Sequence, residues 1–182
     1  MHSVSGFLDE LNKQHNRELD LKQSLENKSN SLLTVCGIII PLLFGFGIFV
    51  IEKIPQSYSL LNVAEALLIS VLVLNIITIF FAVWATKICN YKYPFLHSNF
   101  FDDNCCLKKS VIKEYTDSKE DEFNDMLIEE YLQSNKFNYD TNEKKAKYIR
   151  IGQYIFIISL SLVPILIVML FSIPPPLVSP TQ

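Results

Sequence analysis

The chain has 182 residues, 49% of them hydrophobic, and a formal net charge of −3. Its sixteen Lys and Arg residues are nearly balanced by nineteen Asp and Glu residues, so no cationic surface suited to nucleic acid is expected. A chain of this length with long apolar runs leaves no room for a full-sized soluble domain beside a membrane bundle. The composition therefore favours a small membrane protein.

Three apolar runs are each long enough to cross a lipid bilayer: Leu32–Ile51, Leu60–Ala85 and Ile151–Ile173. A helix of about 20 residues, rising ~1.5 Å per residue, spans a hydrocarbon core of ~30 Å. The sequence therefore predicts an all-α fold. It is an integral membrane protein with three transmembrane helices and a helical cytosolic insert.

Basic residues are distributed very unevenly around these runs. Fifteen of the sixteen lie before the first run or between the end of the second and the start of the third, and only Lys53 lies between the first two. Because loops rich in Lys and Arg remain in the cytosol, we expect a multi-pass protein of the cell membrane with a cytosolic N-terminus and an external C-terminus.

The expected organisation is a cytosolic arm, three membrane helices, one large cytosolic insert and two short external pieces. Almost nothing lies outside, which argues against a receptor for an external ligand. The segments in chain order are the arm 1–30, the first membrane helix 31–52, the external loop 53–59, the second membrane helix 60–87, the insert 88–150, the third membrane helix 151–173 and the Pro-rich tail 174–182.

The arm carries a thin apolar stripe, interrupted at His15 and Glu18, that consists of Leu8, Leu11, Leu21 and Leu25. No Gly or Pro separates it from the first membrane run, so one helix from about residue 7 to about residue 51 is expected. We favour an amphipathic arm packed on the insert. A self-associating coiled-coil stub is the alternative, disfavoured because the stripe is too interrupted for regular heptads.

In the first membrane helix Gly37, Pro41 and Gly45 recur every four residues on one face. Small residues at this spacing allow another backbone to approach closely. Pro41 cannot donate a backbone hydrogen bond, so a kink is expected there. A static packing groove is favoured over a gating hinge, because membrane helices tolerate Pro.

The second membrane helix carries Asn75 near the bilayer midplane, and Thr78, Ala82 and Ala85 continue its small and polar stripe. An unpaired amide in hydrocarbon costs several kcal/mol, whereas an interhelical hydrogen bond contributes roughly 0.6–2 kcal/mol. Asn75 is therefore expected to face another helix. A role in helix packing is favoured over a position lining a water-filled path.

The insert shows two signals for a helix start. Asp117 with Glu120 predicts a helix over about 118–137, and Asp140 with Glu143 predicts a second one that continues into the third membrane run, where Pro164 is expected to bend it. Four basic residues at this junction are expected to contact lipid headgroups, at about 1 kcal/mol per charge. They are Lys144, Lys145, Lys147 and Arg150.

Sequence motifs for catalysis or ligand binding are not found. Phosphate-binding glycine loops, zinc-protease motifs and nucleophile elbows are all missing, so no enzyme, cofactor, small-molecule substrate or catalytic residue is expected. A transition-metal site is disfavoured, since the spacing of the nearest candidates matches no familiar site. Those candidates are His97, Asp102, Asp103, Cys105 and Cys106.

Two stretches resemble a known group of proteins. They are ENKSNSLLTVCGIIIPLLFGFGIF, at the entry of the first membrane helix, and IEEYLQSNKFNYDTNEKKAKYIRIGQYIFI, an acidic helix, an Asn-rich turn and a Lys-rich junction. The pattern is similar to prokaryotic few-helix membrane proteins that serve as effectors of Pycsar- and CBASS-type defence systems. Pycsar effectors that sense a cyclic nucleotide in the same chain carry a β-rich binding domain. Because this insert is predicted to be helical, the resemblance implies a sensor in another protein, or a different role.

Two hypotheses follow. The first is a non-enzymatic membrane protein that forms oligomers or serves as a subunit or scaffold, with its helical insert presented to a cytosolic partner. The alternative is a membrane-permeabilising effector or small channel in defence or stress signalling, assembled from several copies around Asn75 and Thr78. Under both hypotheses the protein contacts the lipid bilayer, and under neither does it bind nucleic acid.

Overall fold

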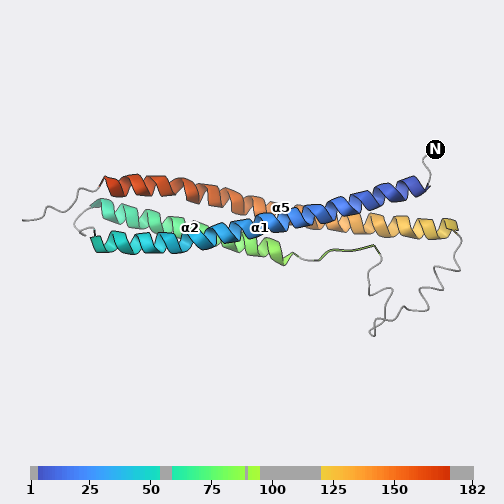
Figure 1. Cartoon of the computed structure of the whole chain (residues 1–182), viewed down its shortest axis with the longest axis horizontal. Helices are drawn as coiled ribbons and strands as arrows, with labels where there is room; N and C mark the ends of the chain where they lie inside the picture. Colours follow the sequence, from blue (N-terminus) through green and yellow to red (C-terminus); the bar gives the residue numbers. More distant parts are fainter. Residues whose placement is uncertain (1–3, 54–58, 89, 95–119, 173–182) are drawn as a thin grey trace, which may run out of the picture. The chain divides into compact units, whose positions relative to one another are not determined.

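The described part of the computed structural model comprises residues 4–53, 59–88, 90–94 and 120–172, and every regular element within it is a helix. The elements are α1 (Val4–Lys53), α2 (Ser59–Lys87) and α5 (Glu120–Phe171) (Figure 1). All three are long and apolar enough to cross a membrane. The predicted all-α membrane fold is thereby confirmed.

The single helix predicted for the arm and the first membrane run is also confirmed, because α1 extends over 50 residues without a break. The predicted break in the insert is wrong. One helix of 52 residues, α5, passes through the Asn-rich stretch and into the third membrane run. No Gly or Pro interrupts residues 120–151, and the Asn side chains bond to other segments, so they do not compete with the helix.

Several predicted features lie outside the described residues. They are the helix start at Asp117, residues 54–58 of the external loop, the tail 174–182 and the candidate metal ligands between His97 and Cys106.

The chain divides into two compact units. The first, which we call the polar unit, comprises residues 1–25 and 88–145, and the second, the apolar unit, comprises residues 26–87 and 146–182. Both α1 and α5 contribute residues to each unit.

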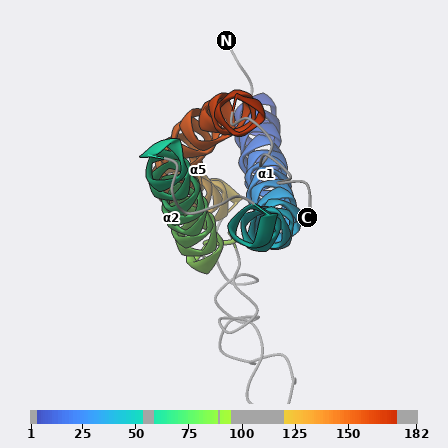
Figure 2. The same ribbon diagram turned by 90° about the vertical axis from the view of Figure 1, so that its left-hand side faces the viewer.

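In the apolar unit, α1, α2 and α5 pack with buried positions that recur every three or four residues. On α2 these positions are Ala64, Val71, Asn75, Thr78, Ala82 and Ala85. Such spacing is typical of helices that pack side by side at small crossing angles. Figure 2 looks along these three helices. Most of the residues on the seam of α2 are small, which lets the neighbouring backbones approach.

In the polar unit, the N-terminal part of α1 packs against the first half of α5 and against Tyr91 and Tyr93. The arm therefore lies on the insert, as favoured from the sequence. Its stripe differs from the prediction, however. Leu21 is 44% exposed, whereas His15, expected to interrupt the stripe, is only 5% exposed. The interior of this unit is thus built largely from polar side chains.

Candidate functional site

A polar layer lies inside the apolar unit, between α2 and α5. The side-chain nitrogen Nδ2 of Asn75 donates to the Val71 carbonyl at 2.9 Å and to Oγ of Ser159 at 2.8 Å. Ser159 Oγ in turn donates to the Val71 carbonyl at 3.2 Å, and Thr78 Oγ1 donates to the Leu74 carbonyl at 2.9 Å. We call Asn75, Thr78 and Ser159 the polar layer.

One hydrogen-bond acceptor of the polar layer, the Oδ1 atom of Asn75, has no partner among the described residues. Asn75 is 1% exposed, and its Oδ1 atom is buried without a hydrogen-bond partner among the described residues. A buried unsatisfied acceptor costs about 1–3 kcal/mol, and native structures contain few of them. The layer can therefore accept a further hydrogen bond, from water or from another donor, in the middle of an otherwise apolar span.

A second polar contact joins α1 to α2 in the same unit. Ser29 is buried, and its hydroxyl donates to the Ala82 carbonyl at 2.8 Å. The acceptor, Ala82, follows Asn75 on α2 by seven residues, so the two lie on the same side of that helix. Polar contacts thus join α2 to both of the other helices of the apolar unit.

The small-residue stripe of α1 does not pack inside the chain. Gly37, Pro41 and Gly45 are all exposed, and a side chain added at either glycine would meet nothing within 4 Å. The predicted packing groove is therefore not occupied by α2 or α5. This face of the membrane helix remains open to lipid or to another protein.

At two other glycines a neighbouring helix lies close to the backbone. A Cβ atom at Gly152 of α5 would lie 3.4 Å from Cβ of Phe81, and one at Gly47 would lie 2.7 Å from Cδ2 of Leu68. Sequence reasoning missed Gly152. The sequence feature that could have indicated Gly152 is its distance of seven residues from Ser159, which places both residues on the same side of α5.

The polar unit is joined by a row of three asparagines on α5, Asn135, Asn138 and Asn142. Asn135 bonds to α1, since Nδ2 donates to the Leu11 carbonyl at 3.1 Å and Oδ1 accepts from His15 Nδ1 at 3.1 Å. Asn138 pairs with the backbone of Lys92, accepting from its nitrogen at 2.9 Å and donating to its oxygen at 2.8 Å.

Asn142 connects three segments at once. Its Nδ2 donates to both the carbonyl and the Oε2 atom of Glu18, each at 2.8 Å, and its Oδ1 accepts from the hydroxyl of Tyr91. The three asparagines are 3%, 0% and 1% exposed in chain order. Buried amides whose nitrogen and oxygen atoms each have a hydrogen-bond partner fix one arrangement of the segments that they join.

The comparison with protein families decides the identity of the chain. Residues 10–172 match PycTM, the Pycsar effector protein domain. The chain belongs to this family. The matched residues include the candidate spans Asn62–Lys87 and Phe123–Met169, the span Gly6–Ile48 from residue 10 onward, the polar layer and the row of asparagines. The predicted resemblance is confirmed. Nothing among the curated proteins or the solved structures matches the chain.

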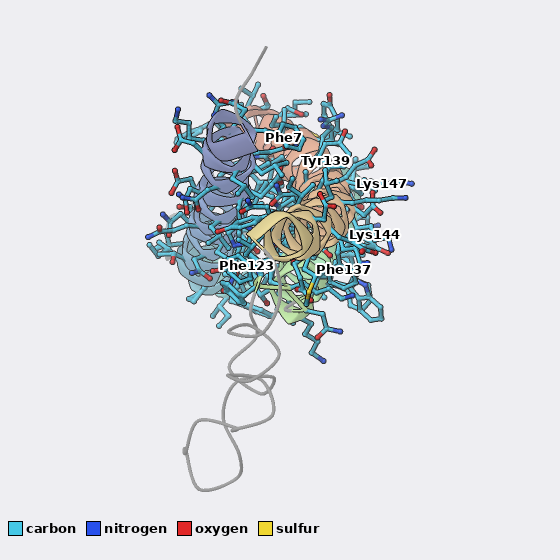
Figure 3. All side chains as sticks on the ribbon, turned by 90° about the vertical axis from the view of Figure 1, so that its right-hand side faces the viewer. Phe7, Phe123, Phe137, Tyr139, Lys144 and Lys147 are labelled. Carbon is cyan, nitrogen blue, oxygen red and sulfur yellow. The ribbon has the colours of Figure 1, made fainter. Side chains whose placement is uncertain are left out.

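The basic junction of this family member differs from the prediction at one position. Lys144, Lys147 and Arg150 are exposed, and Figure 3 shows the side chains of the first two extending away from α5. Lys145 is 0% exposed, and its Nζ lies 5.6 Å from the ring centroid of Tyr91. The predicted headgroup contact of Lys145 is therefore wrong. The reason is its position on the buried seam, three residues after Asn142.

Among the described residues no group of three or more His, Cys, Asp or Glu side chains is placed to hold a metal ion. The chemistry that these sites offer is hydrogen bonding by neutral amides and hydroxyls.

Proposed function

We propose that this chain is a non-enzymatic membrane effector of defence signalling, which acts as an oligomer and makes the membrane permeable. The observation that carries the proposal is the polar layer, because it places an amide and two hydroxyls within the membrane spans of a Pycsar effector domain. Polar groups at membrane depth are costly, and they commonly mark paths for ions or water.

The exposed surface of the apolar unit supports the oligomer. Only 22%, 22% and 17% of the most apolar stretches of the three spans are buried. The rest is available to lipid and to further copies of the chain, and the open face of Gly37, Pro41 and Gly45 offers the close approach that membrane helices use to associate. In this proposal, activation turns the polar layer towards water between the copies.

The permeability proposal is tested with a membrane-potential dye in cells with inducible expression of the chain, with and without a co-expressed nucleotide cyclase. We expect depolarisation by the wild-type chain. Asn75→Leu should abolish most of it, because it removes the central amide at similar volume. The matched control is Ser70→Leu, since Ser70 is an exposed residue of α2 whose hydroxyl donates to the Ala66 carbonyl of its own helix. Unchanged potential and growth with the wild-type chain under both conditions would refute the proposal.

We further propose that the N-terminus and residues 88–150 lie in the cytosol, on the basis of the distribution of basic residues. In a background without the native cysteines, Ser57→Cys should react with an impermeant maleimide on intact cells. Ser24→Cys should react only after the membrane is opened. Labelling of position 24 from outside would invert the topology.

A scaffold role is the second candidate, and one observation favours it. The polar unit exposes large apolar and aromatic side chains, among them Phe137 and Tyr139 (Figure 3), and Tyr139 is 54% exposed. We propose that this surface receives a cytosolic partner, which would supply the nucleotide sensing. A photo-cross-linking residue at position 139 should capture a second protein in native membranes. The same residue at the exposed position 133 serves as the control, and equal capture at both positions would argue against a specific surface.

A further inference from the structure

A groove of about 550 Å³ lies on the apolar unit between α1 and α5. It is lined by Leu32 of α1 and by Arg150, Gln153, Tyr154, Phe156 and Ile157 of α5. Its volume lies in the range of roughly 300–1,000 Å³ that is typical of small-molecule sites.

The lining changes character along α5. Arg150, Gln153 and Tyr154 provide hydrogen-bond donors at one end, and Phe156 and Ile157 are apolar. Arg150 and Ile157 are seven residues apart, a rise of roughly 10 Å along a helix. No basic residue follows Arg150 in the sequence, so this position marks the change from polar to apolar surface. The groove thus has a charged end at Arg150 and an apolar end at Phe156 and Ile157.

Arg150 is the charged residue among the described residues that line this groove. In the apolar unit, residues 27–51, 66–87 and 146–182 contain no Asp or Glu. The same stretches contain four basic residues, namely Lys28, Lys87, Lys147 and Arg150. Among the described residues that line the groove, none places a carboxylate beside the guanidinium of Arg150. A planar guanidinium binds phosphate through two parallel hydrogen bonds.

We propose that this groove binds one anionic phospholipid. The lipid phosphate is held by Arg150 with Gln153 and Tyr154 beside it, and an acyl chain lies along Leu32, Phe156 and Ile157. The site is distinct from the polar layer, and it does not depend on the proposed permeability function. It requires only that the apolar unit lie in a bilayer.

The proposal is tested by native mass spectrometry of the purified full chain in detergent, with phosphatidylglycerol or phosphatidylcholine of identical acyl chains added. We expect one retained lipid and a preference for phosphatidylglycerol. Arg150→Gln should reduce that preference about tenfold, because hydrogen bonds to charged groups are the strong ones. Glycerol 3-phosphate at the same concentration should not compete, since it lacks the acyl chain.

The matched control is Lys147→Gln, which removes the same charge from an exposed position three residues earlier that does not line the groove. It should keep the preference. Equal losses in both variants would mean adsorption to a generally basic surface and would overturn the proposal, as would equal retention of the two lipids by the wild-type chain. Since Arg150 is exposed, its substitution should leave the size-exclusion profile unchanged.

Discussion

The buried positions of the polar unit and of the apolar unit recur with the same spacing of three or four residues. In the polar unit they hold mostly polar side chains, and in the apolar unit mostly small or apolar ones. On the α5 seam of the polar unit the buried positions hold Asn138, Asn142 and Lys145. The same helix continues into the apolar unit with Ile149, Gly152, Ser159 and Leu166 at its buried positions. One continuous helix, α5, therefore contributes polar side chains to the interior of one unit and mostly small or apolar side chains to the interior of the other.

The difference follows from what each unit gains by packing. Between membrane helices the hydrophobic effect gives no driving force, so close contact of small residues and a few hydrogen bonds hold the apolar unit together. The polar unit depends on amides whose nitrogen and oxygen atoms each have a hydrogen-bond partner, and these specify which segments meet. We expect the polar unit to lose stability steeply when one amide is removed, and the apolar unit to respond mainly to changes in volume.

The largest effect is expected for Asn142→Leu. It leaves the buried hydroxyl of Tyr91 and two acceptors of Glu18 without this partner. At roughly 0.5–1.5 kcal/mol for each of the three hydrogen bonds that are lost, we expect a loss of about 3 kcal/mol. Hydrogen exchange of the amides of residues 120–145 measures it as easier local opening. Gln133→Leu, at an exposed position of α5, is the control, and equal exchange in both variants would contradict the role of the asparagines.

A smaller effect is expected for Gly152→Leu in the apolar unit. The new side chain would begin 3.4 Å from Phe81 and 3.7 Å from the Thr78 carbonyl, so α2 and α5 must separate. Overpacking of this kind costs about 1–3 kcal/mol. Unfolding in mixed micelles should show the loss. Gly37→Leu adds the same atoms where nothing lies within 4 Å, and it should leave the stability of the monomer unchanged.

The smallest effect on stability is expected for Asn75→Leu, which makes the same chemical change as Asn142→Leu. Interhelical hydrogen bonds in membranes contribute about 0.6 kcal/mol on average, and the substitution also removes the unpartnered Oδ1 atom. We expect a change of at most about 1 kcal/mol in the same micelle assay. A loss as large as that of Asn142→Leu would show that the two units do not differ in the way proposed.

The sequence by itself determined the fold class, the three membrane spans, the continuity of α1 and the resemblance to the effector family. These depend on run length, hydropathy and the lack of helix-breaking residues, which are local properties of the chain. Asn75 was singled out for the same reason, since an amide within an apolar run is visible without any structure.

Only the tertiary structure decided which polar residues become interior. Asp140 with Glu143 was interpreted as the start of a second helix, and the Asn-rich stretch before it as a turn, because asparagines favour turns when their amides are free. The partners of Asn138 and Asn142 lie far away along the chain, at Lys92 and at Glu18, 46 and 124 residues distant. The burial of Lys145 and the outward direction of Gly37 likewise depend on which side of each helix the neighbouring segments occupy. No local pattern carries that information, because it arises from contacts made only when the distant segments meet.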